Sequence, residues 1–564
     1  MPSEPATADP TFERPRRDPR WLRWVNTPRS AWALVGGVTI ARLLWLAFLS
    51  PLTLTEDEAH YWLWSTAPDW SYATKPPGIA WVIRCSTAFF GHSEFAVRAP
   101  AALFGALGAL AAADGARTLT ANNQHARAHT VAFVASAITL LAPALALLGF
   151  IATIDSPLLA CWLGAVALAL RAAARPERLR AWLLAACAIA LGALFKHTAL
   201  LLLPGLLWVA FLHRLAFWKL GAIALVALAG MVPTLVWNAR HDWVTLHHLL
   251  DHLSPGAPGS VTEGEGGVPW LLRVLSPLEY LGFLLIIAGP VPMILIMARL
   301  FRRFPWPRQT PDLILLALPL GVFYLAVSLF TRTEAGWALA APATLLPLGA
   351  YAIVLGVRHN IWPIRFLWGL TLVLGLATWG AMLLLEPLSR TDAADVLPAH
   401  RALGLREHAG AVRAELERLE AATGLPPFVL SHHYGRASQL AFYLPDTEIY
   451  CASAHVGGRI TQFDLWPATN LDHPETQERL SARPALVLGG SPERWRFAFE
   501  TLQPLGTLAA DPKAPRPAYL ATGYRGFPPP VVTGDGAPFF EAMPLERIDP
   551  VVPPRRPPSP VPSP

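Results

Sequence analysis

Long apolar stretches separated by short polar segments occupy the first two thirds of the chain. A helix needs about 20 apolar residues to cross the hydrocarbon core of a bilayer. By this criterion the pattern predicts about eleven membrane-spanning helices. Their approximate ranges are 30–51, 95–116, 128–150, 156–174, 181–196, 198–213, 218–237, 274–298, 311–330, 337–356 and 361–385. The segment 66–94 is amphipathic, and we expect it to lie at the membrane interface without crossing.

The pattern changes after about residue 386. The stretch "HRALGLREHAGAVRAELERLEAATG" has helical periodicity and mixed charge, whereas "PPFVLSH" and "PALVLGG" are typical of short buried strands. We therefore expect a small α/β domain over 386–548. The ends, 1–29 and 549–564, are rich in proline and polar residues. The first is expected to be a cytoplasmic tail and the second a disordered one.

Composition supports a membrane protein. Hydrophobic residues make up 53% of the 564 residues and charged residues only 15%, whereas soluble domains carry about 25% charged residues. The net charge of +6 comes mostly from arginines in loops, so it is poor evidence for nucleic-acid binding. The 4 cysteines form no CxxC pair, so neither a zinc site nor a disulfide framework is indicated.

The distribution of arginine and lysine predicts the orientation. Basic residues gather in alternate loops, as they do on the cytoplasmic side of membrane proteins. This places the N-terminus in the cytoplasm. The loops 52–94 and 238–273 and the domain after residue 386 then lie on the opposite side. In a Gram-negative cell, the protein would be in the inner membrane and these parts in the periplasm.

Acidic residues follow the first predicted span and precede the fourth. Asp57 and Glu58 lie in "LTLTEDEAHYWLWS", and Asp155 lies in "FIATIDSPLL". With the predicted orientation, all three face the same side of the membrane, where carboxylates are costly and usually functional. A carboxylate can deprotonate an acceptor hydroxyl, and the nearby Lys75 can hold a phosphate as a point charge. The alternative is that these acids only cap helices.

Other residues are secondary candidates. Tyr61 belongs to an aromatic run that suits either the headgroup level or stacking on a sugar ring. Lys196 ends a span of about fifteen apolar residues. A helix of this length rises roughly 22 Å, less than the roughly 30 Å hydrocarbon core. Lys196 is therefore expected to be recessed beneath the outer surface, as a second phosphate contact or a snorkelling side chain. The metal-binding candidates have i, i+3 and i+4 spacing in the second outer loop and are His248, Asp251 and His252. A solvated loop helix is the competing interpretation.

Several motifs together resemble the bacterial members of glycosyltransferase family 39. They are "DEAHYWLWS", "KPPGIAWVI", "SEFAVRAPAALFGALGA", "TIDSPLLACW", "KHTALLLLPGL" and "WNARHDWVTLHHLL". This group includes the protein mannosyltransferases and the lipid A aminoarabinose transferases, and the resemblance covers roughly 30–385. It implies the GT-C fold and an inverting transfer of sugar from a polyprenyl-phosphate donor to a periplasmic acceptor.

The resemblance also implies roles for individual residues. Asp57 matches the general base or acceptor-positioning acid, Asp155 matches the second motif aspartate, and Lys75 matches the lysine that binds the donor phosphate. The acceptor would be lipid A or lipopolysaccharide, another glycolipid, or a protein. No cofactor is required by this chemistry, although a divalent metal remains a candidate.

Three other functions remain open from the sequence. A transporter or flippase of lipid-linked sugars predicts inverted repeats and polar residues at the bilayer midplane, neither of which is evident. A non-catalytic receptor would leave the two aspartates and Lys75 without a shared task. A ligase or polymerase of surface polysaccharide is the closest enzymatic alternative.

Overall fold

The chain forms two compact units, one of which is discontinuous in sequence. The computed structural model describes residues 19–121, 123, 125–253, 270–287, 289–300, 304–329, 335–391, 401–508, 516–527, 531–532 and 538–539. The first unit comprises 1–50 and 68–388, and the second comprises 51–67 and 389–564.

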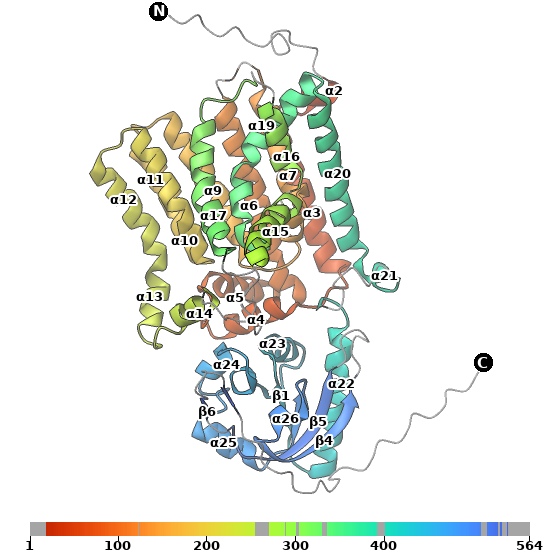
Figure 1. Cartoon of the computed structure of the whole chain (residues 1–564). Coiled ribbons are helices and arrows are strands. Elements are labelled where there is room, and N and C mark those ends of the chain that lie inside the picture. Colours follow the sequence, from red (N-terminus) through yellow and green to blue (C-terminus); the bar gives the residue numbers. More distant parts are fainter. Residues whose placement is uncertain are drawn as a thin grey trace, which may run out of the picture. The chain divides into compact units, whose positions relative to one another are not determined.

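The first unit is built from helices (Figure 1). Its longer helices begin with α3 (Ser30–Phe48), α5 (Gly78–Phe90), α6 (Glu94–Thr120), α7 (Ala128–Leu141), α9 (Asp155–Ala174) and α10 (Leu179–Ala193). They continue with α11 (Leu202–Leu212), α12 (Phe217–Leu228), α14 (Val244–Leu253), α15 (Trp270–Ile287), α16 (Val291–Leu300), α17 (Thr310–Val327), α19 (Leu346–Arg358) and α20 (Trp362–Leu383). Short helical turns join them: α2 (Arg20–Trp24), α8 (Pro143–Leu147), η1 (His197–Leu201), η2 (Ala229–Met231), α13 (Val232–Asn238), η3 (Ala335–Ala338), α18 (Ala340–Thr344) and α21 (Leu385–Ser389).

Six helices of the described part are long and apolar enough to cross a membrane. They are Ser30–Phe48, Glu94–Thr120, Asp155–Ala174, Phe217–Asn238, Thr310–Val327 and Trp362–Leu383. The pair Gly336–Thr344 and Leu346–Arg358, bent by 54°, makes a seventh if it is one span. The protein is thus an integral membrane protein with many helices, but the expected count of eleven spans is not confirmed.

Local breaks shorten the remaining apolar segments. In the segment 128–150, α7 ends before Pro143, because the residue before a proline is pushed out of the helical region. In 274–298, the chain turns at Gly289, whose φ of 67° favours glycine, between α15 and α16. In 181–196, the helix ends at Ala193 and Lys196 is extended. Each of these segments is helical, as predicted, but in shorter pieces.

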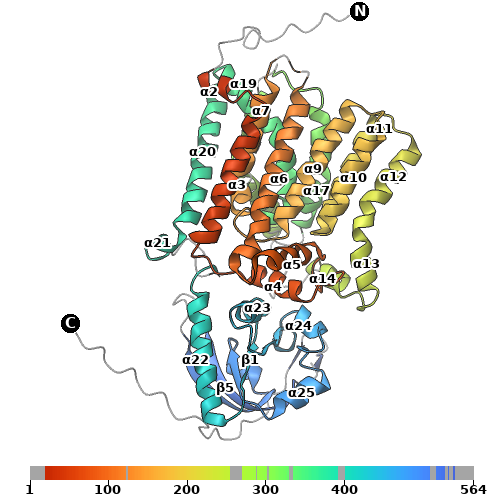
Figure 2. The ribbon, with the colours of Figure 1, turned by 180° about the vertical axis from the view of Figure 1, so that it is seen from behind.

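Small residues allow the central helices of the first unit to pack closely. A Cβ added at Gly108 of α6 would lie 3.7 Å from the Ala160 Cα of α9, and one at Gly115 would lie 3.7 Å from the Ala167 Cα. Backbones approach in this way where membrane helices pack through glycine and alanine. The same contact is visible from behind, where α6 and α9 run beside one another (Figure 2). This packing fixes the start of α9, where Asp155 lies.

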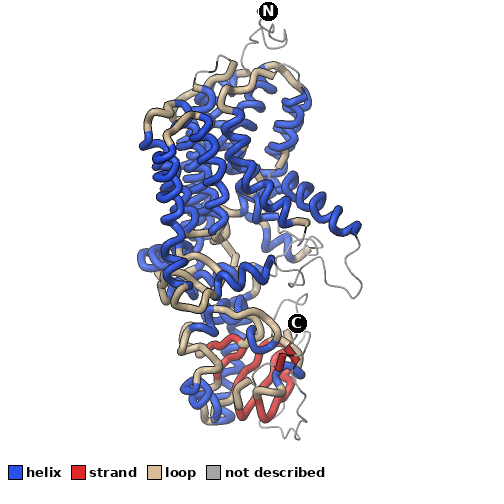
Figure 3. Tube along the Cα trace, turned by 60° about the vertical axis from the view of Figure 1, so that its left-hand side comes forward, coloured by secondary structure: helices blue, strands red, loops and turns tan. Residues whose placement is uncertain are grey.

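The second unit contains a five-stranded sheet (Figure 3). Its strands are β1 (Phe428–Ser431), β2 (Ile449–Cys451), β3 (Ala485–Leu488), β4 (Phe499–Thr507) and β5 (Pro517–Tyr524), in the order β2-β1-β3-β5-β4. Strands β2, β1 and β3 are parallel, with Val429 aligned to Ile449 and Leu486, and β5 is antiparallel to β3 and β4. A separate ribbon pairs β6 (Val531–Val532) with β7 (Pro538–Phe539). The two strands predicted from "PPFVLSH" and "PALVLGG" are confirmed as β1 and β3.

Both faces of this sheet are covered by helices. Alternate residues of β1 and β3 belong to two separate apolar clusters. One cluster includes α22 (Leu405–Thr423), the predicted charged helix, and α23 (Tyr434–Tyr443). The other includes α25 (Pro474–Ser481) and α26 (Pro492–Trp495), and the short η6 (Ser453–Val456) and α24 (Gln462–Leu465) complete the unit. The expected small α/β domain is therefore present.

The helix α4 (Glu56–Thr66) belongs to this second unit, although the sequence placed 52–94 with the membrane helices. Backbone N–H groups of Thr53 and Leu54 donate to the Ala402 carbonyl at 2.8 Å and to the Tyr443 hydroxyl at 2.8 Å. Gly435 makes the approach of α23 possible, because a Cβ there would lie 2.5 Å from the Glu56 Cβ. These long-range contacts explain the difference, since no local pattern reports them.

Candidate active site

Asp155 and Lys196 form an ion pair in the first unit. The Lys196 Nζ donates to the Asp155 Oδ1 at 2.8 Å, and the side chains are only 13% and 24% exposed. Asp155 is the first residue of α9 and follows the N-cap residue, Ile154. The partner of its carboxylate is therefore Lys196, in another segment of the chain. The pair places one carboxylate and one ammonium group beside each other at the start of a long helix.

Lys75 lies on a loop that hydrogen bonds connect to His197, the residue directly after Lys196. The His197 imidazole contacts the Thr234 hydroxyl at 3.3 Å. The Ser71 hydroxyl lies 3.4 Å from the Thr234 hydroxyl and donates to the Lys75 carbonyl at 3.2 Å. This network joins the loop of Lys75 to the segment of Lys196. The structure thus brings Lys75, Lys196 and Asp155 into one polar region of the first unit.

Two residues that the sequence analysis did not single out organise this region. Trp237 donates its indole N–H to the Asp69 carboxylate at 2.8 Å, and Trp81 donates to the Asp69 carbonyl at 2.9 Å. Asn238 accepts from the Thr245 N–H at 3.0 Å and donates to the Thr234 carbonyl at 2.9 Å. The motif "WNARHDW" was the available signal, but its partner Asp69 lies 168 residues from Trp237.

The three acidic residues at the start of α4 have different surroundings in the second unit. The Glu56 carboxylate pairs with the Arg436 guanidinium at 2.7 Å. The Glu58 carboxylate is buried and accepts the Thr55 N–H at 2.9 Å, which completes a capping box. The Asp57 side chain is exposed. Capping therefore accounts for Glu58 and ion pairing for Glu56, and Asp57 is the exposed member of the three.

Aromatic rings surround His60 on the next turn of α4. His60 is 4% exposed, and its ring centroid lies 4.7 Å from those of both Trp64 and Tyr434. Its Nδ1 is 2.9 Å from the Ser438 hydroxyl. Tyr61 is also buried, with its ring centroid 5.3 Å from that of Trp64. The His60 contacts fix α4 against α23. Tyr61 packs within α4, in addition to the headgroup or sugar-stacking role expected from the sequence.

Acidification is expected to weaken the folding of the second unit through His60. Burial, together with the charges of Arg459 and His433, lowers the pKa of His60 to about 3, against about 6.5 in the unfolded chain. The unfolded state then binds more protons below pH 6.5, so stability falls as the pH is lowered. At pH 4 the loss should be about 3 kcal/mol relative to pH 7.

Thermal unfolding of the full protein in nanodiscs measures this effect. We expect the midpoint to fall steeply between pH 6.5 and 4, and His60→Gln, which keeps a hydrogen-bonding side chain without a titrating ring, to fall less. Equal slopes for the two proteins over this range would contradict the assignment to His60.

The metal candidates lie on α14, which confirms their helical spacing, but the side chains of His248, Asp251 and His252 are outside the described residues. Among the described side chains, no group of three or more His, Cys, Asp or Glu residues could hold a metal ion. Metal binding by His248, Asp251 and His252 stays a prediction. The described site residues divide between the units: Asp155, Lys75 and Lys196 in the first, and Asp57, Glu58 and Tyr61 in the second.

In comparisons with known proteins, this chain is similar to glycosyltransferases. Residues 74–237 match the family described as dolichyl-phosphate-mannose-protein mannosyltransferase. A curated relative is the lipid A galacturonosyltransferase RgtD of Rhizobium johnstonii (strain DSM 114642 / LMG 32736 / 3841). It is 25% identical over 404 residues, which are 70% of this chain and 78% of the relative.

Two solved structures have a similar fold. They are ArnT from Cupriavidus metallidurans bound to undecaprenyl phosphate and the same protein in the apo state. Each superposes with a TM-score of 0.56 at 17% identity, and the match covers 88% of this chain and 98% of ArnT. At this identity the match shows the fold, which extends over both compact units.

Proposed function

We propose that this chain is a GT-C glycosyltransferase, like the proteins that it resembles, and that it transfers a sugar from a polyprenyl-phosphate donor to an acceptor outside the cytoplasm. The observation that carries this proposal is the Asp155–Lys196 ion pair, which hydrogen bonds through His197, Thr234 and Ser71 connect to the loop of Lys75. An ammonium group held by a carboxylate, with a second lysine on a connected loop, suits a phosphate that must be bound and then released. Binding of undecaprenyl phosphate by ArnT supports a donor of this chemical class.

The lysines would bind the donor phosphate. An ammonium group has three N–H donors, and Lys196 directs one of them to Asp155. Its other donors and the ammonium group of Lys75 are proposed to hold phosphate oxygens. Their charge would stabilise the phosphate as it leaves, because fixed charges lower a barrier most where charge develops. Asp155 would keep Lys196 in place and limit the net charge of the site.

Asp57 would be the general base. Its carboxylate takes the proton of the acceptor hydroxyl or amine as that group attacks the anomeric carbon of the donor sugar. The bond from that carbon to the phosphate oxygen breaks, and the polyprenyl phosphate leaves with both electrons of the bond. A single in-line displacement inverts the anomeric centre. It requires one base and a stabilised leaving group, without a covalent carboxylate intermediate.

A lipid A-type glycolipid is the proposed acceptor, with other glycolipids, lipopolysaccharide and proteins as the alternatives. The support is RgtD, which acts on lipid A according to its name. Its match covers 70% of this chain at 25% identity. We further propose an inner-membrane location with the N-terminus in the cytoplasm, eleven membrane crossings and the α/β unit in the periplasm. The support for this orientation is the clustering of arginine and lysine in alternate loops.

A transfer assay tests the proposed function. The purified protein in nanodiscs would receive a panel of radiolabelled polyprenyl-phosphate sugars and a lipid extract from a Gram-negative membrane. We expect labelled lipid from the wild type and at least tenfold less from Lys75→Ala. Movement of the donor across the bilayer of sealed proteoliposomes, without labelled product in the nanodisc assay, would favour a flippase. Equal labelling by both proteins would remove Lys75 from the donor site.

A further inference from the structure

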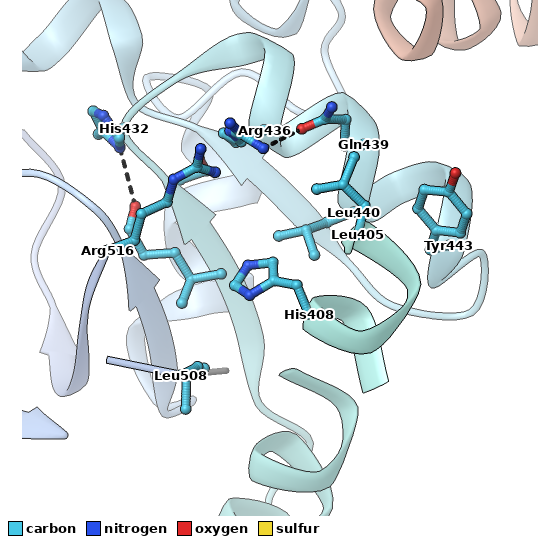
Figure 4. Close-up of a pocket in the computed structure, with 11 residues that line it drawn as sticks. Leu405, His408, His432, Arg436, Gln439, Leu440, Tyr443, Leu508 and Arg516 are labelled. Carbon is cyan, nitrogen blue, oxygen red and sulfur yellow. Dashed lines mark hydrogen bonds between the residues drawn. The ribbon is translucent and has the colours of Figure 1, made fainter. Parts of the chain in front are cut away.

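A pocket in the second unit lies at the end of its parallel strands (Figure 4). Ser431 and His432 line it at the end of β1, and Leu488 lines it at the end of β3. The chain passes from β1 to β2 on one side and then to β3 on the other. The carboxyl ends of β1 and β3 are therefore a topological switch point, where ligands bind in open α/β sheets.

Two glycines after β3 leave room for the His432 ring at this end of the sheet. Gly489 and Gly490 have φ angles of 77° and 72°, which favour glycine. A Cβ at Gly489 would lie 2.1 Å from the His432 Nδ1. The His432 ring is held by a 3.2 Å hydrogen bond between its Nδ1 and the Leu488 carbonyl. The two strand ends are thus built around the imidazole at the pocket wall.

The charged lining favours an anion. Arg516 contributes one guanidinium group, and Arg436 contributes a second, which already pairs with Glu56. His408 and His432 contribute imidazoles, and none of the lining residues is acidic. The planar fork of an arginine matches the oxygens of a phosphate or carboxylate. Leucine side chains form the apolar part of the lining: Leu405, Leu440, Leu488 and Leu508. This combination suits a phosphate attached to a larger group with an apolar face, such as a sugar ring.

The same wall holds the segment that leads into α4. Arg436 pairs with Glu56, and the Gln439 amide donates to the Leu54 carbonyl at 2.8 Å. The Tyr443 hydroxyl accepts the Leu54 N–H at 2.8 Å. All three α23 residues also line the pocket. A ligand in the pocket would therefore contact the side chains that position the helix carrying Asp57.

We propose that this pocket binds a phosphate group of the acceptor, so that the α/β unit recognises the acceptor and links its binding to α4. Phosphate binding in the pocket stands independently of catalysis. Its assignment to the acceptor rests on the proposed function.

Phosphate binding tests the proposal in the full-length protein in nanodiscs. The background would carry Lys75→Ala and Lys196→Ala, which remove the proposed donor phosphate site, and no donor would be present. The probes are inorganic phosphate and glucose 6-phosphate, titrated by isothermal calorimetry. We expect saturable binding that weakens at least tenfold in Arg516→Gln. Arg525→Gln is the matched control, because Arg525 is an exposed arginine of the same unit that pairs with Glu500 outside the pocket.

The outcomes distinguish phosphate binding in the pocket from the assignment of that phosphate to the acceptor. Absence of saturable binding, or equal weakening by Arg516→Gln and Arg525→Gln, would overturn the pocket assignment. Tighter binding of glucose 6-phosphate than of inorganic phosphate would support a glycolipid headgroup, whereas the reverse order would indicate a site for free phosphate and overturn the acceptor assignment. His408→Gln gives a second pocket variant if Arg516→Gln does not fold. Because no donor takes part, a failed transfer assay leaves this test unaffected.

Discussion

Replacement of Asp57 by asparagine is expected to lower kcat by about 10²–10⁴-fold, the range that a positioned general base contributes. The substitution keeps the shape of the side chain and removes its ability to take a proton. Since Asp57 is exposed on α4, the thermal-unfolding midpoint should change little. The measurement is the single-turnover rate of sugar transfer with saturating donor and acceptor.

Glu58 provides the matched control for Asp57. Its buried carboxylate completes the capping box with Thr55. Glu58→Gln keeps an acceptor for the Thr55 N–H, so stability should fall by only about 0.3–1 kcal/mol, through loss of the negative charge at the helix N-terminus. The transfer rate should fall far less than in Asp57→Asn. If Glu58→Gln abolished transfer in a folded protein while Asp57→Asn remained active, the role of base would pass to Glu58.

The second large effect is expected from Lys196. Its replacement by alanine leaves the poorly exposed Asp155 carboxylate without its 2.8 Å partner. Breaking a buried pair in this way costs about 3–5 kcal/mol, and a smaller loss of roughly 2–3 kcal/mol is expected here because the pair is partly exposed. Donor binding should weaken as well, since one phosphate contact is lost.

Exchange of the two charges separates these effects. The double variant Asp155→Lys with Lys196→Asp restores an ion pair, so the thermal-unfolding midpoint should recover relative to Lys196→Ala. Transfer should not recover, because the ammonium group is displaced from the proposed phosphate site. Recovery of transfer together with stability would show that only the pairing matters, and it would remove Lys196 from donor binding.

Local patterns in the sequence predicted much of the secondary structure. Apolar length located α3 and α9 to within a few residues, and the buried runs "PPFVLSH" and "PALVLGG" became β1 and β3. The count of spans was not predictable in the same way. Breaks at Pro143 and Gly289 divide apolar segments that a hydropathy window reads as continuous.

The contacts that form the candidate site join residues far apart in the sequence, and local sequence patterns do not predict such contacts. Asp155 lies at the start of α9 and Lys196 lies just after the end of α10. No periodicity within either helix predicts that the two side chains form an ion pair. The same is true of the Asp69–Trp237 hydrogen bond and of the attachment of α4 to α23. The acidic cluster drew notice by its composition, but only tertiary contacts distinguish Glu56, Glu58 and Asp57.

The discontinuity of the second unit has a consequence for biosynthesis. Residues 51–67 leave the ribosome roughly 320 residues before the remainder of their unit begins at 389. At about 5–20 residues per second, this delay is on the order of tens of seconds. During that time α4 has neither Arg436 nor the sheet to pack against. Asp57 and its aromatic neighbours therefore lack their packing partners until the rest of the unit has been synthesised. A ribosome that stops early would release membrane helices whose α4 has no partner, and only completed chains would carry an ordered first loop.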